Sequence, residues 1–176
     1  MVHGENLIAI PAKNMLFAKT IFMAGTYSQI HIQTVFAVKY RMALLDVSWE
    51  DRLQKYITGI VQNHGHKMLA INNVEDHIHL FFGLRPGQSV SNLMQNVKSD
   101  STVWINQQQF TERKFYWQEG FSAFSYNKSD IDRVVKYIMN QKEHHKTVSM
   151  QDENHAMLKD AGIEFDVRYT FKPPMD

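Results

Sequence analysis

The sequence contains no cysteine among its 176 residues. This absence excludes disulfide bonds, zinc sites built from thiolates and cysteine nucleophiles. It fits a reducing compartment, so we expect a cytoplasmic protein. The sequence also lacks an apolar run of the roughly 20 residues that a membrane-spanning helix needs, so no membrane partner is expected.

An excess of charge of one sign is also missing. Lysine and arginine total 19, aspartate and glutamate total 18, and the net charge is +1 with neutral histidines. Bulk charge therefore gives no sign of a nucleic-acid partner, which would have to be bound by a local basic patch. The length, with 44% hydrophobic and 21% charged residues, is typical of one globular domain with a full core.

The chain divides into three predicted parts. Residues 14–25 are mostly apolar and resemble a weak signal peptide, but the run is short and Lys19 interrupts it. We therefore interpret residues 1–25 as an N-terminal extension. Residues 26–147 are expected to form the folded domain, and residues 148–176 a C-terminal helix and tail.

Alternating apolar residues and turn signals predict strands over 27–38, 67–74, 77–83 and 123–126. Helical spacing predicts helices over 48–65, from 89 to about 104, over about 130–146 and, more weakly, over 154–161. We expect Ser48, Ser89 and Ser129 to cap the first three helices. This order predicts an α+β fold, with helices packed on an antiparallel sheet.

The motif His77-Ile78-His79 lies within one of the predicted strands. Residues two apart in a strand share a face, so Ile78 would point into a core and both imidazoles would lie side by side opposite it. That is how a sheet presents a pair of metal ligands. Two histidines on a solvated strand face would have the same spacing, and the motif alone does not distinguish the two.

Tyr137 and Gln141 lie one turn apart on the predicted helix over 130–146. Alone, each would be interpreted as an ordinary helix residue, but together with His77 and His79 they suggest a site. Two imidazole nitrogens and a carboxamide oxygen suit Mg²⁺ or Mn²⁺ with positions open for phosphate oxygens, and imidazole favours Mn²⁺. The Tyr137 hydroxyl would attack phosphorus and form a phosphotyrosyl intermediate. Because tyrosine has a pKa of about 10, it needs a base, a cation or a metal that the sequence does not identify.

Four segments, in this order, resemble those of a known family. They are Val38-Lys39-Tyr40-Arg41, Glu75-Asp76-His77-Ile78-His79-Leu80, Trp117-Gln118-Glu119-Gly120-Phe121 and Tyr137-Ile138-Met139-Asn140-Gln141. Over about residues 26–147 the chain resembles the HUH-type, single-tyrosine transposases of the TnpA type. These occur in bacterial and archaeal insertion sequences that move as single-stranded DNA.

The resemblance implies a ferredoxin-like or RRM-like antiparallel sheet and a homodimer, with the tyrosine acting in the site of its own or the other subunit. It implies binding of DNA hairpins at the element's ends, cleavage of one strand, a 5′ phosphate kept on tyrosine, and rejoining that excises or inserts the element. By matching position, His77 and His79 would be metal ligands, Gln141 the third ligand and Tyr137 the nucleophile.

Single-strand binding needs cations for the backbone and flat rings for the bases. The candidates are Lys39, Tyr40, Arg41, Lys98, Arg113, Lys114 and Trp117, with Arg85, Tyr116 and Lys128 as further possibilities. His64-Gly65-His66 repeats the His-x-His spacing, but Gly65 indicates a helix end, where an imidazole complements the helix dipole. His144 and His145 are interpreted in the same way, although His144 could assist proton transfer at Tyr137.

Three functions remain open from the sequence. They are an active transposase, a related tyrosine transposase domesticated to process palindromes of its host genome, and a non-catalytic module that binds single-stranded nucleic acid. The presence of all four candidate site residues argues against the third.

Overall fold

An antiparallel sheet forms the centre of the protein in the computed structural model, which describes residues 27–167, 170 and 171. Its strands are β1 (His31–Ala37), β2 (Lys67–Asn73), β3 (His77–Gly83) and β4 (Ser122–Tyr126), in the order β2-β3-β1-β4. This arrangement confirms the predicted α+β class and the ferredoxin-like topology. The predicted extension, residues 1–25, lies outside the described residues, and the division into three parts stays a prediction.

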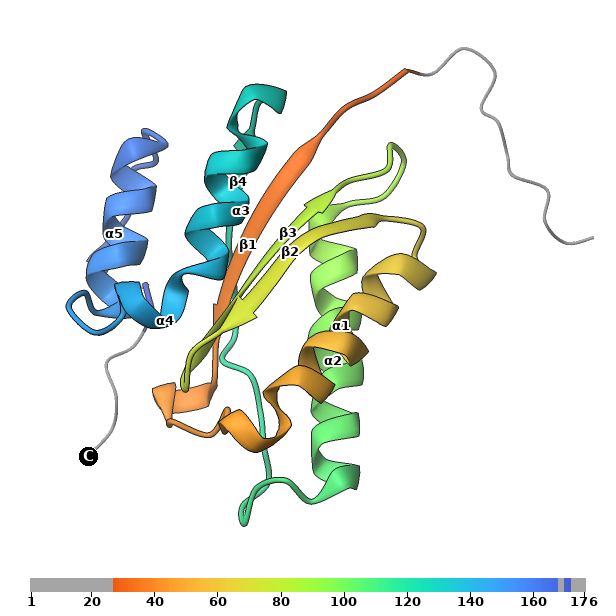
Figure 1. The fold of residues 1–176 in the computed structure, drawn as a ribbon, viewed down its shortest axis with the longest axis vertical. Helices are drawn as coiled ribbons and strands as arrows, with labels where there is room; N and C mark the ends of the chain where they lie inside the picture. The colour runs from red at the N-terminus through yellow and green to blue at the C-terminus, as the bar shows by residue number, and fades with distance from the viewer. Residues whose placement is uncertain (1–26, 168–169, 172–176) are drawn as a thin grey trace, which may run out of the picture.

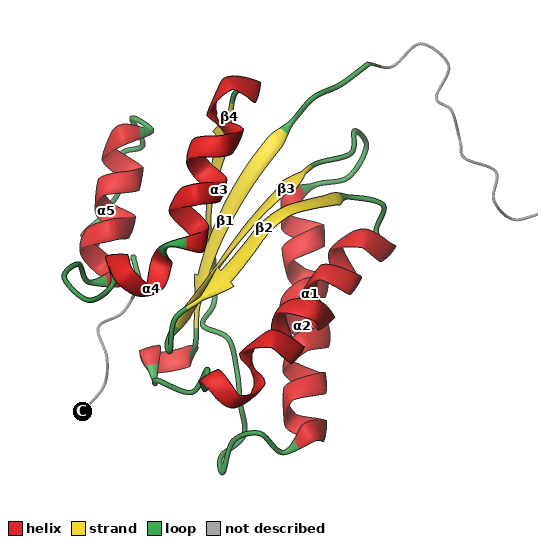
Figure 2. Cartoon of the chain, in the orientation of Figure 1, coloured by secondary structure: helices red, strands yellow, loops and turns green. Residues whose placement is uncertain are grey.

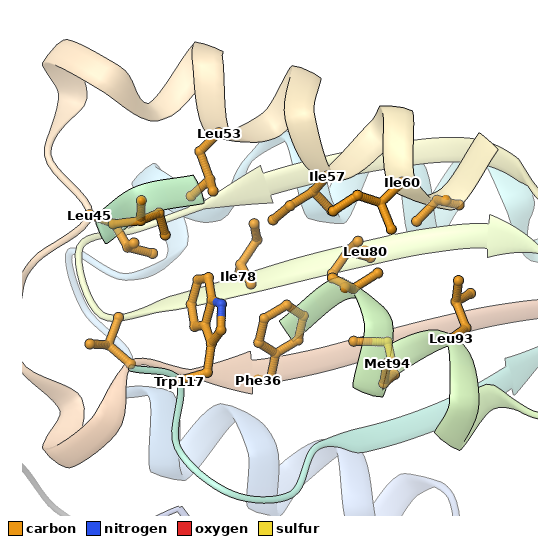
Figure 3. Packing of buried hydrophobic residues seen from close by; sticks show 14 of the residues in the cluster. Phe36, Leu45, Leu53, Ile57, Ile60, Ile78, Leu80, Leu93, Met94 and Trp117 are labelled. Carbon is orange, nitrogen blue, oxygen red and sulfur yellow. The ribbon is translucent and has the colours of Figure 1, made fainter. Parts of the chain in front are cut away.

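Two long helices, α1 (Val47–Asn63) and α2 (Val90–Gln108), cover one face of the sheet (Figure 1). They enclose the main core, to which β3 contributes Ile78 and Leu80. Phe36 of β1 packs edge-on against Trp117, with ring centroids 4.8 Å apart. Figure 3 shows these side chains meeting residues from both helices. The apolar residues that alternate with the histidines in β3 therefore pack into the main core.

The other face is covered by α3 (Ile131–Met139), α4 (Gln141–His144) and α5 (Met150–Asp160) (Figure 2). Smaller apolar clusters join this layer to the sheet: Phe81 packs with Val134 and Ile138, and Val35 with Met150. Both faces of β3 are therefore covered by helices. None of the helices in the described segments is both long and apolar enough to cross a membrane.

Two of the three predicted helix caps are wrong. Asp46 caps α1, its carboxylate accepting a 2.8 Å hydrogen bond from the Ser48 amide, so Ser48 lies inside the first turn. Ser89 caps α2 as predicted, by accepting from the Asn92 amide at 3.1 Å. Ser129 lies in a short 3₁₀ turn, Lys128–Asp130, and α3 starts after it without a side-chain cap.

The helix predicted over 130–146 is interrupted at Asn140, whose backbone (φ −96°, ψ 12°) ends α3 and begins α4. The side chain of Asn72 donates hydrogen bonds to the carbonyl oxygens of Ile138 and Met139, at 2.9 and 3.2 Å. Those carbonyls lie at the end of α3, where helical partners run out. The interruption leaves Gln141 fully buried at the start of α4.

Candidate active site

The His77 and His79 side chains lie side by side on the face of β3 that α3, α4 and α5 cover, because both rings approach Glu153 of α5 and the His79 ring lies near Tyr137 of α3. Both are 0% exposed and their ring centroids are 5.1 Å apart. The two imidazoles share one strand face, as predicted. The alternative, in which this face is solvated, is wrong because both side chains are buried. The Nε2 atom of each ring has no hydrogen-bond partner among the described residues. Buried polar atoms without a partner are rare, so the pair has the character of a ligand site.

An aspartate and an arginine orient His77. Its Nδ1 donates to the Asp76 carboxylate at 2.6 Å, and the other Asp76 oxygen accepts from Nε and Nη2 of Arg41 at 2.9 and 2.7 Å. Burial favours the neutral carboxyl, but the hydrogen bonds and charges of His77 and Arg41 outweigh it and lower the pKa of Asp76. With Nδ1 donating in this way, Nε2 of His77 faces the site and carries a lone pair when the ring is neutral.

Gln33 of β1 holds the other ring. Its Nε2 lies 3.1 Å from Nδ1 of His79, while its Oε1 is buried without a hydrogen-bond partner in the described chain. A half-turn of the amide would let Oε1 accept a hydrogen from Nδ1 and would leave Nε2 of His79 with its lone pair. Burial lowers the pKa of His79 to about 4, against the opposing effect of Glu153. His79 is therefore neutral at pH 7, the form that binds metals.

Tyr137 and Gln141 reach the same place from α3 and α4. The Tyr137 ring centroid lies 6.2 Å from that of His79. The Tyr137 hydroxyl and the Gln141 Nε2 both donate to Oε1 of Glu153, the latter at 2.8 Å. Gln141 Oε1 is buried without a hydrogen-bond partner in the described part of the chain. The structure thus brings together, within one chain, the four residues that the sequence analysis selected.

Sequence reasoning missed Glu153 and misread His145. Glu153, on α5, is 3% exposed, and its Oε2 lies 3.1, 3.4 and 3.6 Å from the Nε2 atoms of His145, His79 and His77. His145 therefore lies in the cluster and does not serve only as a cation at a helix end. One signal was available: Glu153 falls on the helical face of Met150 and Met157, where a carboxylate is out of place unless it is paired.

This cluster fits a divalent cation. One ligand atom from each of His77, His79, His145 and Glu153 lies within 4.8 Å of the others. The partnerless Gln141 Oε1 is a further donor at the site. A cation placed among these atoms would satisfy polar groups that are otherwise buried without partners.

The nucleophile candidate lies in an unusual electrostatic setting. Burial, followed by the charge of Glu153 and the hydrogen bond to it, raises the pKa of Tyr137 above its ordinary value. Burial would raise the pKa of Glu153 too, but the imidazoles of His145, His77 and His79 beside the carboxylate lower that pKa strongly. Without an added positive charge, therefore, the Tyr137 phenolate is disfavoured at neutral pH.

Two cavities reach the cluster from different sides. One of about 800 Å³ is lined by Tyr126, Tyr137 and Glu153 between β4, α3 and α5. The other, of about 1020 Å³, is lined by Asp76 and His145. Residues of the cluster therefore line both cavities.

Three of the proposed DNA contacts have partners inside the protein. Arg41 is 9% exposed and bound to Asp76; the 7% exposed Trp117 donates from its indole to Ser101 at 2.8 Å. Lys98 donates to backbone carbonyls at 2.5 and 2.7 Å and is only partly exposed. These internal contacts give the three side chains structural or positioning roles, and their predicted contacts with DNA stay predictions.

The remaining candidates are exposed: Lys39, Tyr40, Arg113 and Lys114. Lys39 Nζ lies 5.3 Å from the ring centroid of Tyr40 and 5.6 Å from that of Tyr116. Lys114 Nζ lies 5.5 Å from the Tyr116 centroid. Four residues, Lys39, Tyr40, Lys114 and Tyr116, thus form what we call the aromatic–lysine patch.

His64 and His66, the other His-x-His pair, lie at the end of α1. His64 is the C-cap residue, and its Nδ1 hydrogen-bonds the Ile60 carbonyl at 2.9 Å. His66 is buried, with Nδ1 accepting from the Arg85 amide and Nε2 bonded to Gln88. The predicted helix-end role is confirmed for His64, and the two rings have separate partners.

Comparison with known proteins places this geometry in a family. The model of the family described as IS200-like transposase matches residues 26–141. The chain belongs to the IS200-like transposases. The resemblance noted from the four sequence segments is thereby confirmed, and the histidine pair belongs to an HUH-type transposase fold.

Three similar proteins share a low sequence identity with this IS200-like transposase. The ISDra2 transposase TnpA of Deinococcus radiodurans is 21% identical over 122 residues, which are 66% of this chain and 87% of that protein. A crystal structure of a Deinococcus radiodurans R1 transposase aligns with a TM-score of 0.52 at 20% identity, covering 66% of this chain and 94% of the other. The REP-associated tyrosine transposase bound to a REP hairpin aligns with a TM-score of 0.53 at 16% identity, over 86% and 92% of the respective chains.

Proposed function

We propose that this transposase cleaves one strand of DNA by direct attack of Tyr137 on a phosphodiester. The tyrosine oxygen forms a bond to phosphorus, and the bond from phosphorus to the 3′ oxygen breaks. The product is a 5′-phosphotyrosine and a free 3′ hydroxyl. Attack of a 3′ hydroxyl on that phosphotyrosine rejoins DNA and releases the tyrosine, so strands are exchanged without an external energy source.

The observation that carries this proposal is the burial of the His77 and His79 imidazoles in one chain with Tyr137, whose ring centroid lies 6.2 Å from that of His79. His77, His79 and Gln141 would hold Mg²⁺ or Mn²⁺, which when bound polarises the scissile phosphate and neutralises developing charge. Asp76 keeps the His77 ring in place, and Gln33 does the same for His79. Glu153 fixes the Tyr137 hydroxyl by accepting its hydrogen bond.

The DNA partner follows from the family and from the chemistry of the surface. We propose that the protein binds imperfect single-stranded hairpins at the ends of a mobile element. The exposed aromatic–lysine patch supplies cations for phosphates and rings for stacking, the combination that single strands require.

We also expect a homodimer. Light scattering of the purified protein in solution tests this expectation, and a monomeric mass would contradict it.

One observation favours a second candidate, processing of palindromes in a host genome. The alignment with the hairpin-bound REP-associated transposase extends over 86% of this chain, compared with 66% for the Deinococcus radiodurans structure. Genomic context separates the two: hairpin-forming ends flanking the gene favour a mobile element, and dispersed palindromes elsewhere in the genome favour the domesticated enzyme.

Covalent trapping tests the function. Purified protein is mixed with hairpin oligonucleotides taken from the sequences that flank the gene or from dispersed genomic palindromes. The mixture contains Mn²⁺, Mg²⁺ or excess chelator. We expect a denaturant-resistant protein–DNA adduct only when metal is present. We expect His77→Ala to bind the hairpin but form no adduct. Adduct formation of the same yield in chelator, or by His77→Ala, would contradict the metal-dependent mechanism.

A further inference from the structure

Glu153 enters the site from α5, which lies beyond the residues 26–141 matched to the family model. Figure 1 shows α5 on the same side of the sheet as α3. The two carboxylate oxygens have different neighbours. Oε1 accepts from Tyr137 and Gln141, with His144 Nε2 at 3.7 Å, while Oε2 faces the Nε2 atoms of three histidines. One oxygen is thus engaged with the nucleophile and the other is directed at the imidazoles.

Two of these histidines, His77 and His145, are oriented as metal ligands are. His145 follows α4 directly, and its Nδ1 hydrogen-bonds the Val148 carbonyl at 2.8 Å. Because a carbonyl only accepts, Nδ1 carries the hydrogen, as Nδ1 of His77 does towards Asp76. Ligand histidines characteristically donate one ring nitrogen to a carbonyl or carboxylate and turn the other to the metal.

In the neutral rings, which are the metal-binding form, the Nε2 lone pairs are directed at the Glu153 carboxylate, whereas a protonated His145 would donate to it. The Nε2 of His145 is 3.1 Å from Oε2 of Glu153, and the His77 and His145 ring centroids are 4.5 Å apart. A nitrogen lone pair and a carboxylate oxygen repel each other unless positive charge lies between them. Three such nitrogens around one oxygen are better matched by one divalent cation than by three separate protons.

We propose that His145 and Glu153 are ligands of the same cation as His77 and His79, so that metal binding fixes α5 to the sheet. This inference rests on the metal-dependent function proposed above and extends its ligand set. Three imidazoles and one carboxylate favour Mn²⁺ or Zn²⁺ over Mg²⁺, which prefers oxygen ligands and keeps its water.

Mn²⁺ titration followed by electron paramagnetic resonance tests the ligand set without requiring activity. The full-length protein is compared with Glu153→Gln, His145→Gln and, as a control on the same helix, the exposed Asp160→Asn. We expect at least about tenfold weaker Mn²⁺ binding for Glu153→Gln and His145→Gln, and no change for Asp160→Asn. In the wild type, electron spin-echo modulation should show coupling to imidazole nitrogen that decreases in His145→Gln.

His77→Ala separates failure of this inference from failure of the proposed function. If Glu153→Gln and His145→Gln bind Mn²⁺ like wild type and His77→Ala does not, the inference is overturned and the smaller metal site stands. If His77→Ala also binds like wild type, the metal centre of the proposed function is wrong as well.

Hydrogen exchange of the wild-type protein gives a measurement that does not depend on whether any variant folds. We expect Mn²⁺ to slow amide exchange in α5, Met150–Asp160, as well as in β3, because the cation would join them. Mn²⁺ that protects β3 and leaves α5 unchanged would overturn the proposal.

Discussion

The Asp76 carboxylate holds His77 through a 2.6 Å hydrogen bond from the ring Nδ1, while Arg41 occupies its other oxygen. His77 therefore faces the site, and the neighbouring Asp76 fixes the orientation of the His77 ring. Arg41 acts through Asp76, which explains why this arginine is buried in a segment first interpreted as a DNA contact.

Asp76→Asn should weaken Mn²⁺ binding by about 10- to 100-fold, the usual effect of removing a partner that orients a ligand histidine. Isothermal titration of the purified variant measures this effect. Asp51→Asn, which alters an exposed carboxylate on α1, serves as the control and should bind like wild type. Unchanged affinity in Asp76→Asn would mean that His77 needs no such support.

Because Ile78 lies on the core face of β3, we expect it to contribute more to stability than an exposed apolar residue. Ile78→Ala should lower the free energy of unfolding by about 2–5 kcal/mol, because it leaves a cavity in a fully buried core. Val103, on α2, is 54% exposed, and Val103→Ala should change the same quantity by less than about 0.5 kcal/mol. Denaturant titration of both variants checks this; equal losses would contradict the assignment of the core face.

We predict that acid lowers the stability of the protein through His66, which lies away from the active site. Burial, opposed by a hydrogen bond to Gln88, lowers its pKa below 6.5, so the folded state binds this proton less readily than the unfolded state. The contribution to stability is therefore present above about pH 6.5 and is lost as the pH falls. Nδ1 of His66 now accepts a hydrogen bond from the Arg85 amide, and protonation would place a hydrogen on Nδ1 that opposes this bond.

The measurement is the free energy of unfolding between pH 5 and pH 7.5 for wild type and His66→Gln. The wild type should gain more stability over this interval than the variant gains. If the two profiles are parallel, His66 does not titrate differently in the folded and unfolded states.

Replacing the two lysines of the aromatic–lysine patch should weaken DNA binding without preventing chemistry. Lys39→Ala with Lys114→Ala should lower the affinity for a single-stranded oligonucleotide. The slope of log affinity against log salt should become shallower by about 0.7 for each phosphate that the variant no longer neutralises. Fluorescence anisotropy at several salt concentrations measures both quantities. Lys55→Ala removes an exposed lysine of α1 and should leave the slope unchanged; an equal effect of Lys55→Ala would indicate non-specific charge.

The sequence predicts what depends on local pattern. Alternation in β3 located the core face through Ile78 and the histidine face through His77 and His79, and helical spacing joined Tyr137 to Gln141. The break at Asn140 was not predictable, because it accompanies hydrogen bonds from Asn72 on a different element. Local spacing therefore cannot identify residues whose roles depend on packing between distant elements.

Glu153 illustrates that limit most clearly. It lies in no recognisable motif, and its neighbours in the site, His77 and Tyr137, are 76 and 16 positions away in the sequence. Only the packing of α5 on the sheet places a carboxylate among three imidazoles. Arg41 shows the same effect in reverse: its charge suggested a surface contact, and tertiary structure assigned it to Asp76.

If Tyr137 is the nucleophile, the covalent bond to DNA lies on its hydroxyl oxygen, and locating that bond decides the assignment. The metal-dependent adduct is digested with protease and nuclease, and tandem mass spectrometry identifies the residue that carries the nucleotide. We expect a 5′-phosphonucleotide on Tyr137, and Tyr137→Phe should bind the hairpin yet form no adduct. A nucleotide on any other residue, or an adduct formed by Tyr137→Phe, would contradict the account.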